Sequence, residues 1–125
     1  MRILSFVFLF IFAVNISAQS ANSEDLAAQA TRQINAGQFE EALTTYKSAL
    51  AAAEKRYAGR TYRARLHYNI GVCYFQLDRL ELATTEFKSA VILKSDYSQA
   101  YTALSKARSR AESRKHLTTN LSGRI

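Results

Sequence analysis

The chain of 125 residues contains no proline, only four glycines and a single cysteine, Cys73. One cysteine cannot form an internal disulfide, which excludes the cysteine-rich scaffolds typical of small secreted animal domains. Four scattered glycines do not form a phosphate-binding loop of the glycine-rich kind. The lack of proline, together with abundant alanine, favours helices over most of the chain.

The first residues have the three parts of a secretory signal. These are a basic residue, Arg2, an apolar run over 3–14 broken only by Ser5, and a small residue, Ala18. The run has about 12 residues, whereas a membrane span needs roughly 20, so a cleaved signal is favoured over a retained anchor. We expect cleavage after Ala18, with Gln19 first in the mature chain. The expected location is periplasmic or secreted, and a disulfide-free chain suits a bacterial envelope.

No other apolar run is long enough to span a membrane, so no transmembrane segment is expected once the signal is removed. No cysteine follows the expected cut directly, which disfavours a lipid anchor.

An internal repeat appears when the chain is shifted so that segment 38–50 falls on segment 79–91. Six positions of the first segment then meet identical residues: Glu40, Ala42, Thr44, Lys47, Ser48 and Ala49. Three further pairs exchange one apolar residue for another: Phe39 with Leu80, Tyr46 with Phe87, and Leu50 with Val91. This similarity indicates the duplication of one structural unit.

Each unit is predicted to be a pair of antiparallel helices. Apolar residues recur at intervals of three and four within both segments, which is the period of one helix face. A further helix precedes each segment, over about 23–36 with Ser23 as its N-cap, and over about 62–77. Gly37 and Asp78 lie at the breaks within the two pairs, where turn conformations are needed.

These patterns resemble the tetratricopeptide repeat family, over about residues 23–111. The positions that match are Leu26, Ala30, Gly37, Phe39, Ala42, Tyr46 and Ala49 in the first unit, and Ile70, Gly71, Tyr74, Leu80, Ala83, Phe87 and Ala90 in the second. The resemblance implies an all-α fold in which helical hairpins stack as a short solenoid. Small residues such as Gly71 and Ala83 would let the helices of one hairpin approach closely.

The sequence departs from the family pattern at several positions. Gln29 and Gln33 replace large apolar residues, Ser95 replaces a proline, and 57–63 is an excess of residues over the usual repeat. A third unit begins over 98–115 with a weak apolar face, which predicts a solvated capping helix. The expected division is a signal at 1–18, a repeat domain at 19–115 with units at about 23–56 and 64–97, and a flexible tail at 116–125.

The resemblance places the first helices of the hairpins on a concave, partner-binding face. The residues expected to bind a partner there are Arg65, Tyr68, Asn69, Val72, Phe75, Gln76, Lys106 and Arg110. Tyr68, Val72 and Phe75 form an apolar strip that suits an extended or helical peptide. The equally weighted alternative is that this strip packs against the capping helix.

One branch of the family holds peptide C-termini with a clamp of lysine, asparagine and arginine residues. Of the clamp positions, only Asn69 is occupied as that branch requires. Ala27, Thr31, Gln99 and Ala103 stand at the other clamp positions. Chaperone-tail binding through that clamp is therefore disfavoured.

The formal net charge of +7 is the second indication of a partner. Basic residues gather over 55–65 and 106–115, so an alternative to protein binding is an anionic polymer or membrane surface bound by the basic C-terminal end. Nucleic acid is disfavoured, because aromatic residues are not interleaved with the cations and export removes the chain from the cytoplasm. Self-association is a further expectation, because two repeats bury little core.

No set of residues predicts catalysis, a metal site or a cofactor, and an interaction protein is expected rather than an enzyme. His67 and His116 are far apart, and no histidines or cysteines have metal-ligand spacing. His67 is expected to be a partly buried packing residue and His116 a solvated one. Cys73 is expected to fill space in the core.

Overall fold

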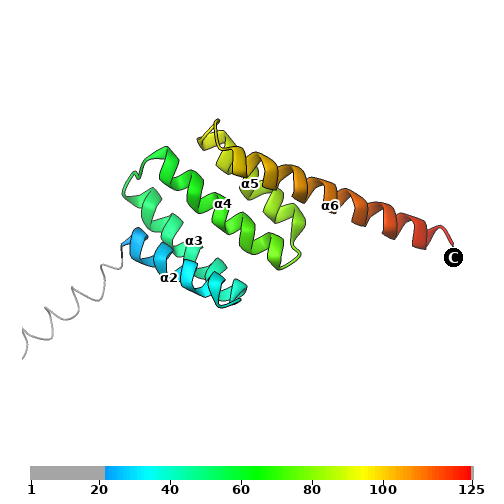
Figure 1. The fold of residues 1–125 in the computed structure, drawn as a ribbon, viewed down its shortest axis with the longest axis horizontal. Coiled ribbons are helices and arrows are strands. Elements are labelled where there is room, and N and C mark those ends of the chain that lie inside the picture. Colours follow the sequence, from blue (N-terminus) through cyan, green and yellow to red (C-terminus); the bar gives the residue numbers. More distant parts are fainter. Residues whose placement is uncertain (1–21, 125) are drawn as a thin grey trace, which may run out of the picture.

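The computed structural model describes residues 22–124, so the expected signal and its cleavage point lie outside the described residues. Five helices follow one another over this range (Figure 1): α2 (Ser23–Asn35), α3 (Phe39–Lys55), α4 (Arg60–Gln76), α5 (Leu80–Leu93) and α6 (Ser98–Ser122). The principal contacts join helices that are neighbours in sequence. The prediction of an all-α array of hairpins with a closing helix is confirmed.

The core lies both within and between the hairpins and follows the predicted register. Ala30, Ala42, Tyr46 and Ala49 of the first unit are buried, and so are the seven matched positions of the second unit, Ile70, Gly71, Tyr74, Leu80, Ala83, Phe87 and Ala90. Gly71 shows why small residues are needed, because a Cβ at this position would lie 2.6 Å from Phe87 Cε1. The helices α4 and α5 therefore meet at a distance that only glycine permits.

The first three helices end in the same way, with a residue in the left-handed backbone conformation. These residues are Gly37 (φ 75°), Tyr57 (φ 53°) and Asp78 (φ 61°). In each case the next amide donates to a carbonyl five residues earlier, as Arg79 does to Tyr74 at 2.9 Å. Gly37 and Asp78 were predicted turn positions, whereas Tyr57 carries a side chain in a conformation that favours glycine.

The excess residues of the first unit lengthen helices rather than a loop. The connections α3–α4 and α5–α6 have the same length, 56–59 and 94–97, and the additional residues extend the C-terminal end of α3 and the N-terminal end of α4. This places Tyr62 beside the start of α2, where its hydroxyl lies 2.8 Å from Ser23 Oγ. The excess segment, residues 57–63, is therefore mostly helical.

The N-cap of α2 is Asn22 and not Ser23, which corrects the sequence-based expectation. Asn22 Oδ1 accepts from the Asp25 amide at 2.9 Å, which satisfies one of the free N–H groups of the first turn. Ser23 is the first helical residue and is 2% exposed. Its hydroxyl donates to the Ala49 carbonyl at 2.7 Å and so ties α2 to α3.

The closing helix α6 is longer than expected. It continues to Ser122, so that 116–122, which the sequence placed in a tail, are helical. In Figure 1 the C-terminal half of α6 runs on past α4 and α5. Within residues 22–124, no helix is both long enough and apolar enough to cross a membrane.

Candidate functional site

A pocket of about 410 Å³ opens between α4 and α6. The apolar strip of α4, Tyr68, Val72 and Phe75, forms one wall. The opposite wall comes from α6, and the complete lining adds Gln76, Phe87, Ser98, Gln99, Thr102, Ala103 and Lys106. Since the three strip residues are only partly buried, they pack against the body of the protein and still expose surface to the pocket. The strip therefore packs only in part against the protein, and its binding of a peptide stays a prediction.

Two cations of α6 cover the exposed edge of the strip. Lys106 Nζ lies 5.7 Å and Arg110 Cζ 5.2 Å from the centre of the Phe75 ring. At these distances a cation is attracted by the face of an aromatic ring. Arg110 also lies 3.7 Å from Asp78, which pairs with Arg114 as well. The pocket thus combines an apolar floor with a positively charged rim.

A second, more polar hollow of about 450 Å³ lies between α2 and α4. Arg65 and Asn69 line it from α4, and Glu24 and Thr31 line it from α2. Its lining also includes Ala27, Ala28, Tyr62, Leu66, Tyr68, Tyr97 and Gln99. Since Tyr68 and Gln99 belong to both hollows, the two are adjacent parts of one groove along the first helices of the hairpins.

Tyr68 separates the two hollows and is held by aromatic contacts. Its ring centre lies 5.7 Å from that of Phe87 and 5.3 Å from that of Tyr97. Desolvation by burial is the main cause that raises the pKa of Tyr97, so its hydroxyl is neutral at physiological pH. Tilted aromatic pairs of this kind restrict the positions of the rings at the boundary between the hollows.

The structure brings the predicted partner-binding residues together. Tyr68, Val72, Phe75, Gln76 and Lys106 line the pocket between α4 and α6. Arg65 and Asn69 line the polar hollow, and Arg110 lies over Phe75. The sequence did not point to Phe87 and Tyr97, which reach the groove from α5 and from the loop before α6. In the sequence alone both residues resemble ordinary core positions, and only the stacking of the hairpins brings them to the groove.

The two histidines and the cysteine lie outside the groove. His67 Nδ1 lies 2.6 Å from Glu86 Oε2, and both side chains are largely buried between α4 and α5. His116 is exposed near Glu112 on α6. Cys73 is fully buried, and desolvation raises the pKa of its thiol to about 11. Among residues 22–124, no three His, Cys, Asp or Glu side chains gather as metal ligands would.

Three of the solved structures with similar folds are tetratricopeptide domains by their titles. The TPR2AB domain of yeast Sti1, in a complex with pHSP90, matches with a TM-score of 0.71 and 17% identity over 77% of this chain. The second tetratricopeptide domain of Spaghetti (RPAP3), bound to the HSP90 peptide SRMEEVD, matches with a TM-score of 0.65 and 18% identity over 86% of this chain. The second tetratricopeptide domain of human RPAP3, bound to an HSP70 peptide, matches with a TM-score of 0.63 and 24% identity over 78% of this chain.

The likeness extends over different shares of those chains. This chain spans 37% of the Sti1 structure, 94% of the Spaghetti domain and 75% of the human domain. No family model and no curated protein matches the sequence. Identities of this size show the fold alone, and that fold is a tetratricopeptide-type helical array.

Proposed function

We propose that the protein is an exported interaction scaffold that binds a peptide segment of another protein in the groove along α2, α4 and α6. The observation that supports this function is the pocket between α4 and α6, with its apolar floor of Tyr68, Val72 and Phe75. Pockets that bind peptide side chains combine such floors with a few polar groups at the rim. The proposal assigns the groove no catalytic role.

Similar domains support a peptide as the partner. Two of the structures above are titled as tetratricopeptide domains bound to chaperone peptides. The groove of this chain differs in its charged groups, because Ala27, Thr31 and Gln99 line it where a carboxylate clamp would need other residues. We therefore infer a peptide partner of a different kind from the chaperone tails in those titles.

A variant that fills the pocket tests this function without disturbing the core. Thr102 is exposed on the α6 wall, and its hydroxyl donates to the Ser98 carbonyl at 3.1 Å. Thr85 is an exposed helical threonine on α5 whose hydroxyl donates to Glu81 at the same distance. Thr102→Phe places a ring in the pocket, whereas Thr85→Phe makes the same chemical change elsewhere.

The measurement is recovery of bound proteins from an envelope extract by immobilised protein. Partners should bind the unchanged protein and Thr85→Phe, and should be lost with Thr102→Phe. Partners that remain at about 0.3 M salt indicate the apolar pocket, because salt at this level screens exposed charges. Equal recovery by both variants would place the binding surface outside the groove.

The exported location is part of the proposal and rests on the pattern of Arg2, the apolar run over 3–14 and Ala18. N-terminal sequencing of the protein recovered outside the cytoplasm should begin at Gln19 or within a few residues of it. Protein recovered there with Met1 still present would contradict cleavage of the signal.

A further inference from the structure

The C-terminal half of α6 presents a helix face that no part of the described chain covers. Residues 112–124 are all exposed, and the helix continues past α4 and α5 (Figure 1). Two leucines stand out on this half, with Leu117 63% and Leu121 65% exposed. They are four residues apart and therefore lie one above the other on the same face.

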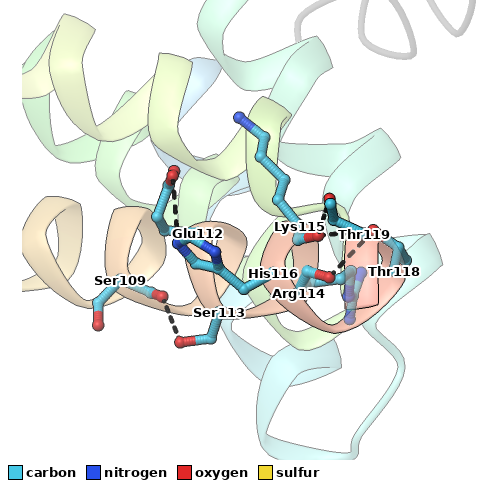
Figure 2. Close-up of polar contacts among 8 residues, drawn as sticks. All are labelled: Ser109, Glu112, Ser113, Arg114, Lys115, His116, Thr118 and Thr119. Carbon is cyan, nitrogen blue, oxygen red and sulfur yellow. Dashed lines mark hydrogen bonds and ion pairs between the residues drawn. The ribbon is translucent and has the colours of Figure 1, made fainter. Parts of the chain in front are cut away.

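The polar side chains around these leucines bond mostly within α6 itself. Ser113 Oγ donates to the Ser109 carbonyl at 3.0 Å, and Thr119 Oγ1 to the Lys115 carbonyl at 2.9 Å (Figure 2). Among the described residues from 112 onward, the pairing of Arg114 with Asp78 is the only polar side-chain contact with the rest of the protein. The leucine face is consequently free to receive a partner.

This face is a continuation of the wall of the groove. Steps of three and four residues, which follow one side of a helix, lead from the pocket to the leucines. The residues on this side are Ala103, Lys106, Arg110, Arg114, Leu117 and Leu121. The first two line the pocket. At 1.5 Å per residue, the distance from Lys106 to Leu121 along the helix is about 22 Å.

The charge of this face decides which occupant fits. Lys106, Arg110 and Arg114 provide three cations, and among the described residues Asp78 is the one acidic side chain that pairs with Arg110 and Arg114. A second copy of the chain carries the same net charge of +7, which opposes its approach to this cationic face and makes it a poor occupant. A partner that carries carboxylates would gain favourable electrostatic energy and a faster encounter.

The shape of the face indicates the conformation of the partner. A helix has no free backbone donors or acceptors along its side, so an extended strand lying on α6 would leave its own backbone groups without protein partners. A partner helix satisfies its backbone internally and can pack its apolar stripe against α6. The pocket of about 410 Å³ then holds a side chain at one end of that stripe.

We propose that the partner segment is an acidic amphipathic helix that lies along α6. One apolar side chain fills the pocket at Phe75, further apolar side chains cover Leu117 and Leu121, and carboxylates face Lys106 and Arg110. This inference rests on the proposed function, since it assigns the chemistry and length of the peptide bound in the same groove.

The test uses protein purified from cells that express the full chain and a fluorescent helical peptide of about 20 residues, or about 30 Å. The peptide carries leucine at helical spacing on one face and glutamate on the others. A second peptide has lysine in place of every glutamate. Fluorescence anisotropy should detect binding of the acidic peptide and not of the basic one.

Matched variants separate this inference from the proposed function. The double variant Leu117→Gln, Leu121→Gln should weaken binding by about tenfold or more, because it removes two apolar side chains that the partner covers. The control Leu82→Gln, Ile92→Gln changes two aliphatic residues of α5 that are 48% and 65% exposed, and should leave binding unchanged. Arg110→Gln should weaken binding, whereas Lys115→Gln, on the opposite side of α6, should not.

Three results would overturn the inference. Binding that is abolished by Thr102→Phe but unaffected by the double leucine variant would keep the groove function and remove the role of distal α6. Equal binding of the acidic and basic peptides would remove the charge argument. Binding of the protein to vesicles with anionic lipid, lost in the double leucine variant, without binding of the acidic peptide would identify α6 as a membrane-surface element.

Discussion

Replacing Gly71 by alanine tests the close packing of α4 on α5. The added Cβ would lie 2.6 Å and 2.7 Å from two ring carbons of Phe87. Phe87 is 2% exposed and its ring also packs on Tyr68, so the ring has little room to move aside. Overpacking of this kind costs about 1–3 kcal/mol. Alanine recovers about 1 kcal/mol through its higher helix propensity, which leaves a net destabilisation of about 1 kcal/mol.

The equivalent position one repeat further along the chain provides the control. Ser105 occupies it on α6, where it is exposed because no further helix follows to cover it within the described residues. Ser105→Ala should therefore gain about 0.5 kcal/mol from helix propensity alone. Thermal unfolding followed by circular dichroism should show Gly71→Ala melting several degrees below the unchanged protein and Ser105→Ala at or slightly above it. An equal rise in melting temperature in both variants would refute the close approach of α4 and α5.

Three further predictions follow from the structure. Ala83→Leu should lower the free energy of unfolding by about 1–3 kcal/mol, because this position is fully buried. Thr85→Leu on the exposed face should change it by less than about 0.5 kcal/mol, and urea unfolding of both variants measures the difference. Tyr57→Gly should raise the melting temperature, because the side chain is 95% exposed and the left-handed conformation costs about 1 kcal/mol in residues other than glycine; an unchanged or lower value would contradict this. Burial raises the pKa of the Cys73 thiol from 9.0 to about 11. The neutral thiol therefore contributes stability that is fully present below pH 9 and is lost as the pH rises toward 11. Alkylation of Cys73 at pH 8 should be slow until denaturant is added.

The repeat register could be predicted from helical periodicity, whereas the position of the groove along the first helices was implied by the resemblance to tetratricopeptide repeats. Once Gly71, Ala83 and Phe87 were aligned with the first unit, the packed faces were determined, and the opposite face of α4 had to carry Tyr68, Val72 and Phe75. Local patterns of three and four residues contain this information, since they fix which side chains share a face.

Features that depend on contacts between distant segments could not be predicted. The burial of Ser23 results from Ala49 and Tyr62, and the pairing of His67 results from Glu86, so neither is visible in the local sequence. The full length of α6 was missed because its second half lacks an apolar stripe. Its side-chain hydroxyls donate to carbonyls of the same helix, an arrangement that periodicity does not reveal (Figure 2).

The central claim is that the groove between α4 and α6 binds a segment of another protein. A photoreactive amino acid placed at Thr102 in cells that express the full chain tests this claim most directly, with the same amino acid at Thr85 as the matched control. The account predicts a discrete crosslinked protein from position 102, absent from position 85 and reduced by Arg110→Gln. Crosslinks of equal yield from both positions, or from position 85 alone, would contradict binding in the groove.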